Sequence, residues 1–243
     1  MQHYSILTYH QIDQAPPPPA TFRSLYVTPA SFRLQMITLK RLGYQGVSMQ
    51  ELMPYVRGEK KGKVIGLTFD DGYTNNLTNA LPVLKEFDFT ATCYVVSHLM
   101  GQHNQWDTPN GVRQAQLMSA EQVKAWSDAG MEVGAHTQNH VNLTQVDDAT
   151  AHQEIASSRH ELTELLGKEV KSFCYPFGFF ERRHVRMAQE AGYQSATTTR
   201  RGRVDATSDV FELKRIPIVR STYWPQFLLK ILTNYEHNKG AQE

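Results

Sequence analysis

The sequence predicts an α/β protein: a closed, somewhat irregular (β/α) barrel formed by one domain over residues 1–243. Three observations favour this fold. Strand-like and helical segments alternate along the whole chain, the strand-like runs number about seven, and several helical segments end at a glycine that leads directly into the next strand. This alternation is typical of parallel sheets built from βα units. Seven or so strands in a chain of this length fit a closed barrel better than an open Rossmann sheet.

The predicted strands are short apolar runs that end in polar or turn-forming residues. In chain order they cover residues 4–10 (YSILTYH), 64–69 (VIGLTF), 90–96 (TATCYVV), 131–136 (MEVGAH), 170–175 (VKSFCY), 193–199 (YQSATTT) and 213–219 (LKRIPIV).

Helical patterns fill the intervals between these strands. The first helix is expected over residues 28–43, with Thr28 as the N-cap, Pro29 at the first helical position and Gly43 as the stop signal. The run of four prolines before it, PPPP at 16–19, predicts a stiff loop and not a domain linker. Further helices are predicted over residues 76–87, 119–130, 148–167, 181–192 and 224–237.

The composition excludes several classes of function. Hydrophobic residues at 40% and charged residues at 20% describe an ordinary soluble globular protein. A formal net charge of +1 gives no reason to expect nucleic acid or an anionic membrane as a partner. No apolar stretch approaches the roughly 18 residues that span a bilayer. The chain has no Gly-x-Gly-x-x-Gly and no Walker loop, so no nucleotide cofactor is expected.

The cysteines and the N-terminus indicate a cellular compartment. Cys93 and Cys174 both fall in strand-like segments, which favours two buried free thiols in a reducing environment over a disulfide or a metal-binding pair. The first residues, MQHYSILTYHQID, lack a basic region followed by a long apolar run, so a signal peptide is not expected. These features together predict a cytoplasmic protein.

Four of the predicted strands end in residues with useful chemistry. Because a βα barrel builds its active site at the C-terminal ends of its strands, we expect these residues to gather at one rim. They are His10 after the first strand, Asp70 and Asp71 after the second, His136 (with His140 four residues on), and the segment from Tyr175 to Gly178.

The two histidines of HTQNH are candidate metal ligands. His136 and His140 have the i, i+4 spacing that lets two imidazoles reach one ion from a single turn. The chain contains ten histidines, so a pair of polar loop residues is an equal alternative for this motif alone. Thr137 stands where a zincin protease needs glutamate, which excludes that class.

The adjacent aspartates of LTFDDG extend this interpretation. Two neighbouring carboxylates repel each other and are costly to bury unless a positive group compensates them. An Asx turn before Gly72 would require only one of them. Two imidazoles and one carboxylate form the three-ligand set of a catalytic zinc, with a position left for water. One aspartate would be the ligand, and the other would act as base on the metal-bound water.

The motifs TFDDG, HTQNH and YPFG, in this order and at these separations, resemble those of the polysaccharide deacetylase family, first described in chitin-oligosaccharide deacetylases. The resemblance covers residues 4–220. It implies an irregular (β/α)7 barrel and a divalent metal, most often Zn²⁺. It also implies roles for individual residues: Asp70 as general base, Asp71, His136 and His140 as metal ligands, and the backbone N–H of Phe177 as part of the oxyanion hole.

The sequence departs from the family pattern in the third motif and beyond. Cys174 occupies the position of an arginine that pairs with the base, and Arg215 in LKRIPIV is a candidate replacement, although a structural ion pair would explain it equally well. No Asp-x-x-Asp-Trp and no clear Leu-x-His follow. In these respects the chain is nearest to the permuted poly-N-acetylglucosamine deacetylases, which begin with a Tyr-His strand similar to YSILTYHQI at 4–12. This similarity implies that His10 is the general acid.

We therefore expect a metal-dependent hydrolase of carbon–nitrogen bonds other than peptide bonds, which removes the acetyl group from N-acetylated sugars such as an N-acetylglucosamine-type saccharide or glycoconjugate. One alternative is an amide hydrolase on the same barrel that acts on a small non-sugar amide or cyclic ureide. Another is a glycan-binding module without turnover, which would predict loss of Asp70 or of a ligand.

Aromatic residues near the predicted rim are candidates for stacking on a sugar ring, or equally for core packing. They are Tyr73, Trp106 and Tyr175. Trp106 belongs to a long polar insertion at 98–117, which we expect to overhang the site.

Overall fold

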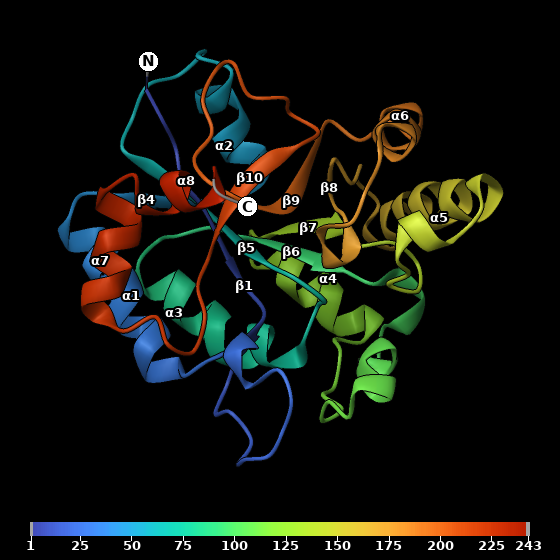
Figure 1. Cartoon of the computed structure of the whole chain (residues 1–243), viewed down its shortest axis with the longest axis horizontal. Helices are drawn as coiled ribbons and strands as arrows, with labels where there is room; N and C mark the ends of the chain where they lie inside the picture. Colours follow the sequence, from blue (N-terminus) through green and yellow to red (C-terminus); the bar gives the residue numbers. More distant parts are fainter. Residues whose placement is uncertain (1, 242–243) are drawn as a thin grey trace.

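Seven parallel strands close into a barrel in the computed structural model, which describes residues 2–241 (Figure 1). Strand β1 pairs with β5 on one side and with β10 on the other, and this double pairing closes the ring. The predicted (β/α)7 barrel is therefore confirmed. Its strands are β1 (Ile6–Tyr9), β5 (Val64–Phe69), β6 (Thr92–Val95), β7 (Glu132–Ala135), β8 (Ser172–Cys174), β9 (Ser195–Arg201) and β10 (Leu213–Pro217).

An additional strand and helix, which the sequence patterns missed, follow the first helix. Strand β4 (Gln45–Val47) pairs with the first half of β5, while β6 pairs with its second half. Helix α2 (Met49–Val56) comes next and begins with a capping box between Ser48 and Glu51. Both elements are short, and Gly46 in the strand and Pro54 in the helix weaken the usual sequence signals.

Most of the predicted helices are present around the strands. Figure 1 shows α5 and α6 on one side of the barrel and α1 and α7 on the opposite side. The predicted cap of α1 is confirmed, because the Thr28 hydroxyl accepts a hydrogen bond from the Ser31 N–H at 3.1 Å. The helices are α1 (Pro29–Arg41), α3 (Leu81–Glu86), α4 (Ala120–Asp128), α5 (Asp148–Leu166), α6 (Arg182–Glu190), α7 (Trp224–Leu232) and α8 (Tyr235–Gly240).

The single helix predicted over residues 224–237 is wrong, because the chain breaks between α7 and α8. Thr233 is extended, with φ −121° and ψ 175°. Its hydroxyl donates to the Leu229 carbonyl and accepts from the Tyr235 N–H at 3.1 Å, so the side chain replaces helical backbone bonds. A threonine that satisfies the backbone locally offers an alternative to helix continuation.

An aromatic cluster fills the space between the barrel wall and the helices. Phe69 at the end of β5 stacks on Tyr9 with 5.5 Å between ring centroids and meets Phe32 and Trp126 edge-on. Truncating a buried phenylalanine to alanine typically costs about 3–5 kcal/mol of unfolding free energy. Phe69 immediately precedes the two aspartates, so this packing fixes the backbone from which they project.

Both cysteines, Cys93 and Cys174, are buried and free, as expected from their positions in strands. Within residues 2–241, no helix has both the length and the apolar character required to cross a membrane.

Two long segments lie at the same end of the barrel, at the bottom of Figure 1. One is the loop that follows β2 (Gln11–Ile12) and contains the four prolines. The other is the 98–117 insertion, which carries the short 3₁₀ helix Gln105–Asn110. Backbone hydrogen bonds tie the insertion to the TFDDG turn, since the N–H of Met118 donates to the Gly72 carbonyl and the N–H of Thr74 donates to the Gln116 carbonyl.

Candidate active site

Asp70 directly follows β5 and is held by an arginine from another strand. Nη1 and Nη2 of Arg215 lie 2.7 Å from Oδ1 and Oδ2 of Asp70, which gives a bidentate pair. Both side chains are almost completely buried, at 1% and 5% exposure. The geometry therefore supplies the positive partner that buried neighbouring carboxylates require.

The remaining hydrogens of Arg215 also have partners. Nε donates to the Thr198 carbonyl at 2.8 Å, Nη1 also reaches the Thr68 hydroxyl at 3.1 Å, and Nη2 also reaches Sγ of Cys174 at 3.3 Å. All five guanidinium donors are thus used, and lysine, with three donors and no fork, would not reproduce the arrangement. Arg215 approaches Asp70 from β10 as the sequence suggested.

Asp71, His136 and His140 form a compact, buried cluster of potential metal ligands. Oδ1 of Asp71 lies 3.4 Å from Nε2 of His136 and 3.3 Å from Nε2 of His140. All three candidate ligand atoms fall within 4.8 Å of one another. One carboxylate and two imidazoles directed at a common point suit Zn²⁺ and leave a fourth position for water or substrate.

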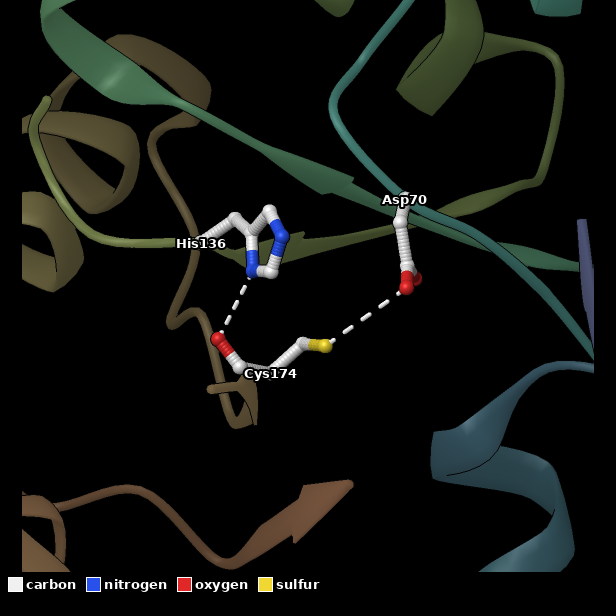
Figure 2. Close-up of side chains that lie close together, drawn as sticks. All are labelled: Asp70, His136 and Cys174. Carbon is white, nitrogen blue, oxygen red and sulfur yellow. Dashed lines mark hydrogen bonds between the residues drawn. The ribbon is translucent and has the colours of Figure 1, made fainter. Parts of the chain in front are cut away.

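The surroundings of His136 fit this role. Nδ1 of His136 lies 2.7 Å from the Cys174 carbonyl and donates to it (Figure 2), so Nε2 is the nitrogen that faces Asp71. Asp70, His136 and Cys174 also lie close together, as Figure 2 shows. These three residues could in principle also surround a cation. The Arg215 guanidinium is already hydrogen-bonded to Asp70 and contacts the Cys174 thiol, so a cation between them would be repelled by a fixed positive charge.

Protonation states in the cluster follow from burial and charge. Burial alone would raise the pKa of Asp70, but the Arg215 guanidinium outweighs it and holds that pKa below its usual value. Burial likewise opposes ionisation of Asp71, and hydrogen bonds from His136 and His140 bring the pKa of Asp71 well below its usual value. Burial lowers the pKa of His140, which favours the neutral imidazole that a metal requires, whereas at His136 the neighbouring Cys174 and Asp71 outweigh burial and raise the pKa well above its usual value.

The loop that carries both histidines has an unusual backbone held by a buried glutamate. Thr137 and His140 adopt positive φ values of 62° and 56°, which cost non-glycine residues about 1–3 kcal/mol each. Glu154 of α5, which is only 5% exposed, stabilises this strained backbone. Its Oε2 accepts from the backbone N–H groups of Gln138 and Asn139, both at 2.9 Å, and its Oε1 accepts from the Asn139 side chain at 2.7 Å. Sequence inspection missed Glu154, because it comes from a neighbouring helix.

His140 is fixed by aromatic rings. Trp106 from the insertion stacks on it with ring centroids 4.2 Å apart, and Phe177 meets it edge-on at 4.5 Å. The insertion therefore does overhang the site. Phe177 itself has a left-handed backbone, with φ 58°, and its N–H has no hydrogen-bond partner within residues 2–241. A free N–H in this turn is available to a ligand.

His10 closes β1 and reaches the same cavity. Its Nε2 lies 4.0 Å from Oδ2 of Asp70, and its side chain is 26% exposed. The structure thus makes His10 and Asp70 close neighbours in the pocket.

A pocket of about 270 Å³ collects these groups beneath an apolar rim. His10, Asp70, Asp71, His136 and His140 form its polar floor. Trp106, Tyr175 and Phe177, which the sequence already indicated, also line the pocket. Sequence reasoning did not reveal the other four lining residues, which are Phe22, Leu25, Asp107 and Thr199.

Of the three aromatic residues considered for sugar stacking, only Trp106 is partly exposed. Tyr73 is 1% exposed and Tyr175 is fully buried, where it stacks on Phe180 at 4.4 Å. Of the two alternatives given for Tyr73 and Tyr175, core packing is therefore the one that the structure supports.

The fold and the pocket define a barrel enzyme whose reacting groups gather at the carboxyl ends of parallel strands. The family described as polysaccharide deacetylase matches residues 57–196. The poly-beta-1,6-N-acetyl-D-glucosamine N-deacetylase of Staphylococcus epidermidis is 22% identical over 217 residues, covering 88% of this chain and 74% of that protein.

Solved structures of deacetylases are similar to this chain in sequence and in fold. The Streptococcus pyogenes deacetylase PplD in complex with acetate is 26% identical, with a TM-score of 0.83, and the match covers 95% of this chain and 98% of that one. BC0361, a polysaccharide deacetylase from Bacillus cereus, is 29% identical with a TM-score of 0.79, covering 95% and 69%.

The chain belongs to the polysaccharide deacetylase family. It is a hydrolase that acts on carbon–nitrogen bonds.

Proposed function

We propose that this protein removes the acetyl group from an N-acetylglucosamine-type saccharide with the help of a divalent cation, most often Zn²⁺ in this family. One observation carries the proposal: an arginine-paired carboxylate, Asp70, lines the same pocket as the Asp71–His136–His140 cluster. The named activity of the Staphylococcus relative, an N-deacetylase of poly-beta-1,6-N-acetyl-D-glucosamine, supports this class of substrate.

Asp71, His136 and His140 would hold the cation. When bound there, it would lower the pKa of a water molecule from 15.7 to about 7 and polarise the acetyl carbonyl. The family as a whole and the donor set support such a cation.

Asp70 would be the general base. Its pKa is lowered by Arg215, so it is ionised and ready to accept a proton from the attacking water at neutral pH. The bidentate contact also fixes the plane of the carboxylate. Arg215 touches neither substrate nor water in this scheme and is a positioning residue.

His10 would be the general acid. Collapse of the tetrahedral intermediate breaks the C–N bond, and the departing sugar nitrogen must receive a proton, because an amide anion is a very poor leaving group. His10 lines the same pocket, 4.0 Å from Asp70. An imidazole is suited to this transfer because its pKa lies near working pH.

Phe177 would contribute its backbone N–H to the developing oxyanion. The left-handed turn at this residue is strained for a non-glycine side chain, and such strain is common where a backbone group must point into a site.

The experiment is to measure acetate release from N-acetylglucosamine oligomers before and after treatment with a chelator. We expect release to stop with chelator and to return when Zn²⁺ is added, while Asp70→Asn binds the ion but releases no acetate. Metal-independent turnover of a cyclic ureide would instead support the small-amide alternative. Sugar binding without any turnover would support a binding module.

A further inference from the structure

One carboxylate in the catalytic pocket has no part in the chemistry described above. Asp107 lines the pocket together with Asp70 and Asp71, and it is only 7% exposed. Asp70 is paired with Arg215, and Asp71 lies within 3.4 Å of two imidazoles that would share a cation with it. Asp107 forms no ion pair with any residue in the part of the chain that the structure describes. A buried aspartate without a cationic partner is rare, because nothing compensates for its lost hydration.

The carboxylate of Asp107 is held through one of its two oxygens. Its Oδ2 accepts a hydrogen bond from Nδ2 of Asn104 at 3.0 Å. Asn104 is itself fully buried, and its Oδ1 accepts from the Ala115 N–H at 2.6 Å, so it is anchored to the far end of the 98–117 insertion. Oδ1 of Asp107 has no hydrogen-bond partner within residues 2–241. Because Asp107 lines the pocket, this oxygen is available to a ligand.

Asp107 also lies close to the groups that the proposed reaction uses. It belongs to the same short 3₁₀ helix as Trp106, which stacks on His140. Its charge is near enough to interact with those of His10 and Asp71. The pocket volume of about 270 Å³ is below the roughly 300 Å³ at which sites for drug-sized ligands begin, so one sugar ring would fill most of it. A ring whose acetamido group reaches Asp71 and His140 would therefore also lie beside Asp107.

The ligand group that best suits this carboxylate is a cation. A sugar hydroxyl could donate to Oδ1, but a neutral amide side chain would accept that bond without the cost of burying a charge. Burial raises the pKa of Asp107 and the Asn104 hydrogen bond opposes the rise, so a positive ligand would stabilise the ionised form. The proposed reaction creates such a ligand, because hydrolysis converts a neutral acetamide into a primary amine. Amines of this kind resemble α-amino groups, whose pKa is about 8, and are mostly ammonium ions at neutral pH.

We propose that Asp107 binds the ammonium group of the deacetylated sugar, so that the amino-sugar product is held in the pocket and inhibits the enzyme. This inference rests on the proposed deacetylase function. The nitrogen of the substrate is an uncharged amide and gains no ion pair from Asp107, whereas the nitrogen of the product does. Asp107 therefore distinguishes the product from the substrate by charge.

The test compares glucosamine with glucose, which carries a neutral hydroxyl at the same carbon, as inhibitors of acetate release from N-acetylglucosamine oligomers at neutral pH. We expect glucosamine to inhibit the wild-type protein about 10- to 100-fold more strongly than glucose, the range for a hydrogen bond to a charged group. Asp107→Asn should remove most of this preference. Asparagine has nearly the same shape and keeps an oxygen for the Asn104 amide, so the variant should fold normally.

Asp13→Asn is the matched control, since Asp13 is an exposed carboxylate that follows β2 and does not line the pocket. It should keep the wild-type preference for glucosamine, which would exclude a general effect of surface charge. Equal inhibition of the wild-type protein by both sugars, or an unchanged preference in Asp107→Asn, would overturn the proposal while leaving the deacetylase function intact. So would an equal loss of the preference in Asp13→Asn.

Calorimetric titration of both sugars into the metal-loaded protein separates the two proposals further. If no saccharide releases acetate, the deacetylase proposal fails, yet tighter binding of glucosamine than of glucose that is lost in Asp107→Asn would still support the ammonium site. If Asp107→Asn weakens the binding of glucose and glucosamine equally, Asp107 accepts a bond from a hydroxyl and the ammonium site is rejected.

Discussion

Arg215 and Asp70 form two parallel hydrogen bonds of 2.7 Å that join the middle of β10 to the end of β5. The family resemblance assigns an arginine to the position of Cys174, on β8. In this protein the guanidinium comes from a different strand, and the cysteine lies against it at 3.3 Å. The proposed base thus has an arginine partner here too, although that arginine comes from another strand.

Replacing Arg215 should move the acid limb of the activity profile. In Arg215→Gln, burial acts on Asp70 without a compensating cation, so the pKa of Asp70 should rise and activity should be lost at a higher pH than in the wild type. Rates across the pH range test this. Arg200→Gln, which alters an exposed ion pair with Glu212, is the control. An identical acid limb in Arg215→Gln would exclude the positioning role.

The same variant should also be less stable at neutral pH. Removing one partner of a buried ion pair costs about 3–5 kcal/mol. Because the folded-state pKa of Asp70 is lowered, its contribution is present above the ordinary value of 3.8 and disappears as the pH falls through the folded value. Urea unfolding at pH 7 should give a much lower free energy of unfolding for Arg215→Gln than for the wild type. This difference should shrink below pH 3.8. A difference in unfolding free energy that does not depend on pH would point to lost packing instead.

Loss of either histidine ligand should remove the metal and the activity together. His136→Ala and His140→Ala each leave two ligands, which hold a divalent ion poorly. Metal content after dialysis measures the effect, and His160→Ala, on the exposed face of α5, provides the control. Full occupancy in either variant would contradict the proposed ligand set.

Glu154 should influence metal affinity without touching the metal. Its carboxylate holds the two backbone N–H groups between the ligand histidines, so Glu154→Ala should let the loop relax from its left-handed conformation. Residues that support metal ligands typically contribute 10- to 100-fold in affinity, and we expect a weakening of about that size by calorimetry. Glu164→Ala on the exposed side of the same helix should bind metal normally. Equal affinities would show that the loop is held by other contacts.

His10→Ala should retain the metal and the fold, but its kcat should fall about 10²- to 10⁴-fold. His3→Ala, an exposed histidine that pairs with Asp205, is the control. Near-normal kcat on an amide substrate would mean that the leaving nitrogen receives its proton from another group.

The parts of the site that sequence reasoning recovered are those encoded locally. Asp70 and His136 follow apolar runs, and a parallel barrel brings strand ends to one rim wherever the strands lie in the sequence. Arg215 was predicted because Cys174 stands where the family has the arginine that pairs with the base, so that another residue had to pair with Asp70. The place of His10 at this rim was predicted in the same way, but sequence order carries no information on the orientation of side chains across the pocket, so its 4.0 Å distance to Asp70 was not.

The parts that sequence reasoning missed depend on tertiary packing. Glu154 reaches the histidine loop from the interior of a long helix, and Phe22 reaches the pocket from an irregular loop. Nothing in their local sequence distinguishes them from other glutamates and phenylalanines. Strand β4 and helix α2 were not predicted for a different reason: tertiary pairing stabilises short segments whose intrinsic propensity is weak.

The position of β1 has a consequence for synthesis of the protein on the ribosome. Leu7 pairs with Ile216 on one side and with Leu67 on the other. The strand that ends at His10 is made before the other six barrel strands, yet it acquires its second neighbour only after more than two hundred further residues have been translated. Until then its other edge is unpaired, and Asp70 lacks Arg215. A nascent chain that already contains TFDDG, HTQNH and YPFG should therefore be catalytically silent, and activity should appear abruptly when β10 leaves the exit tunnel.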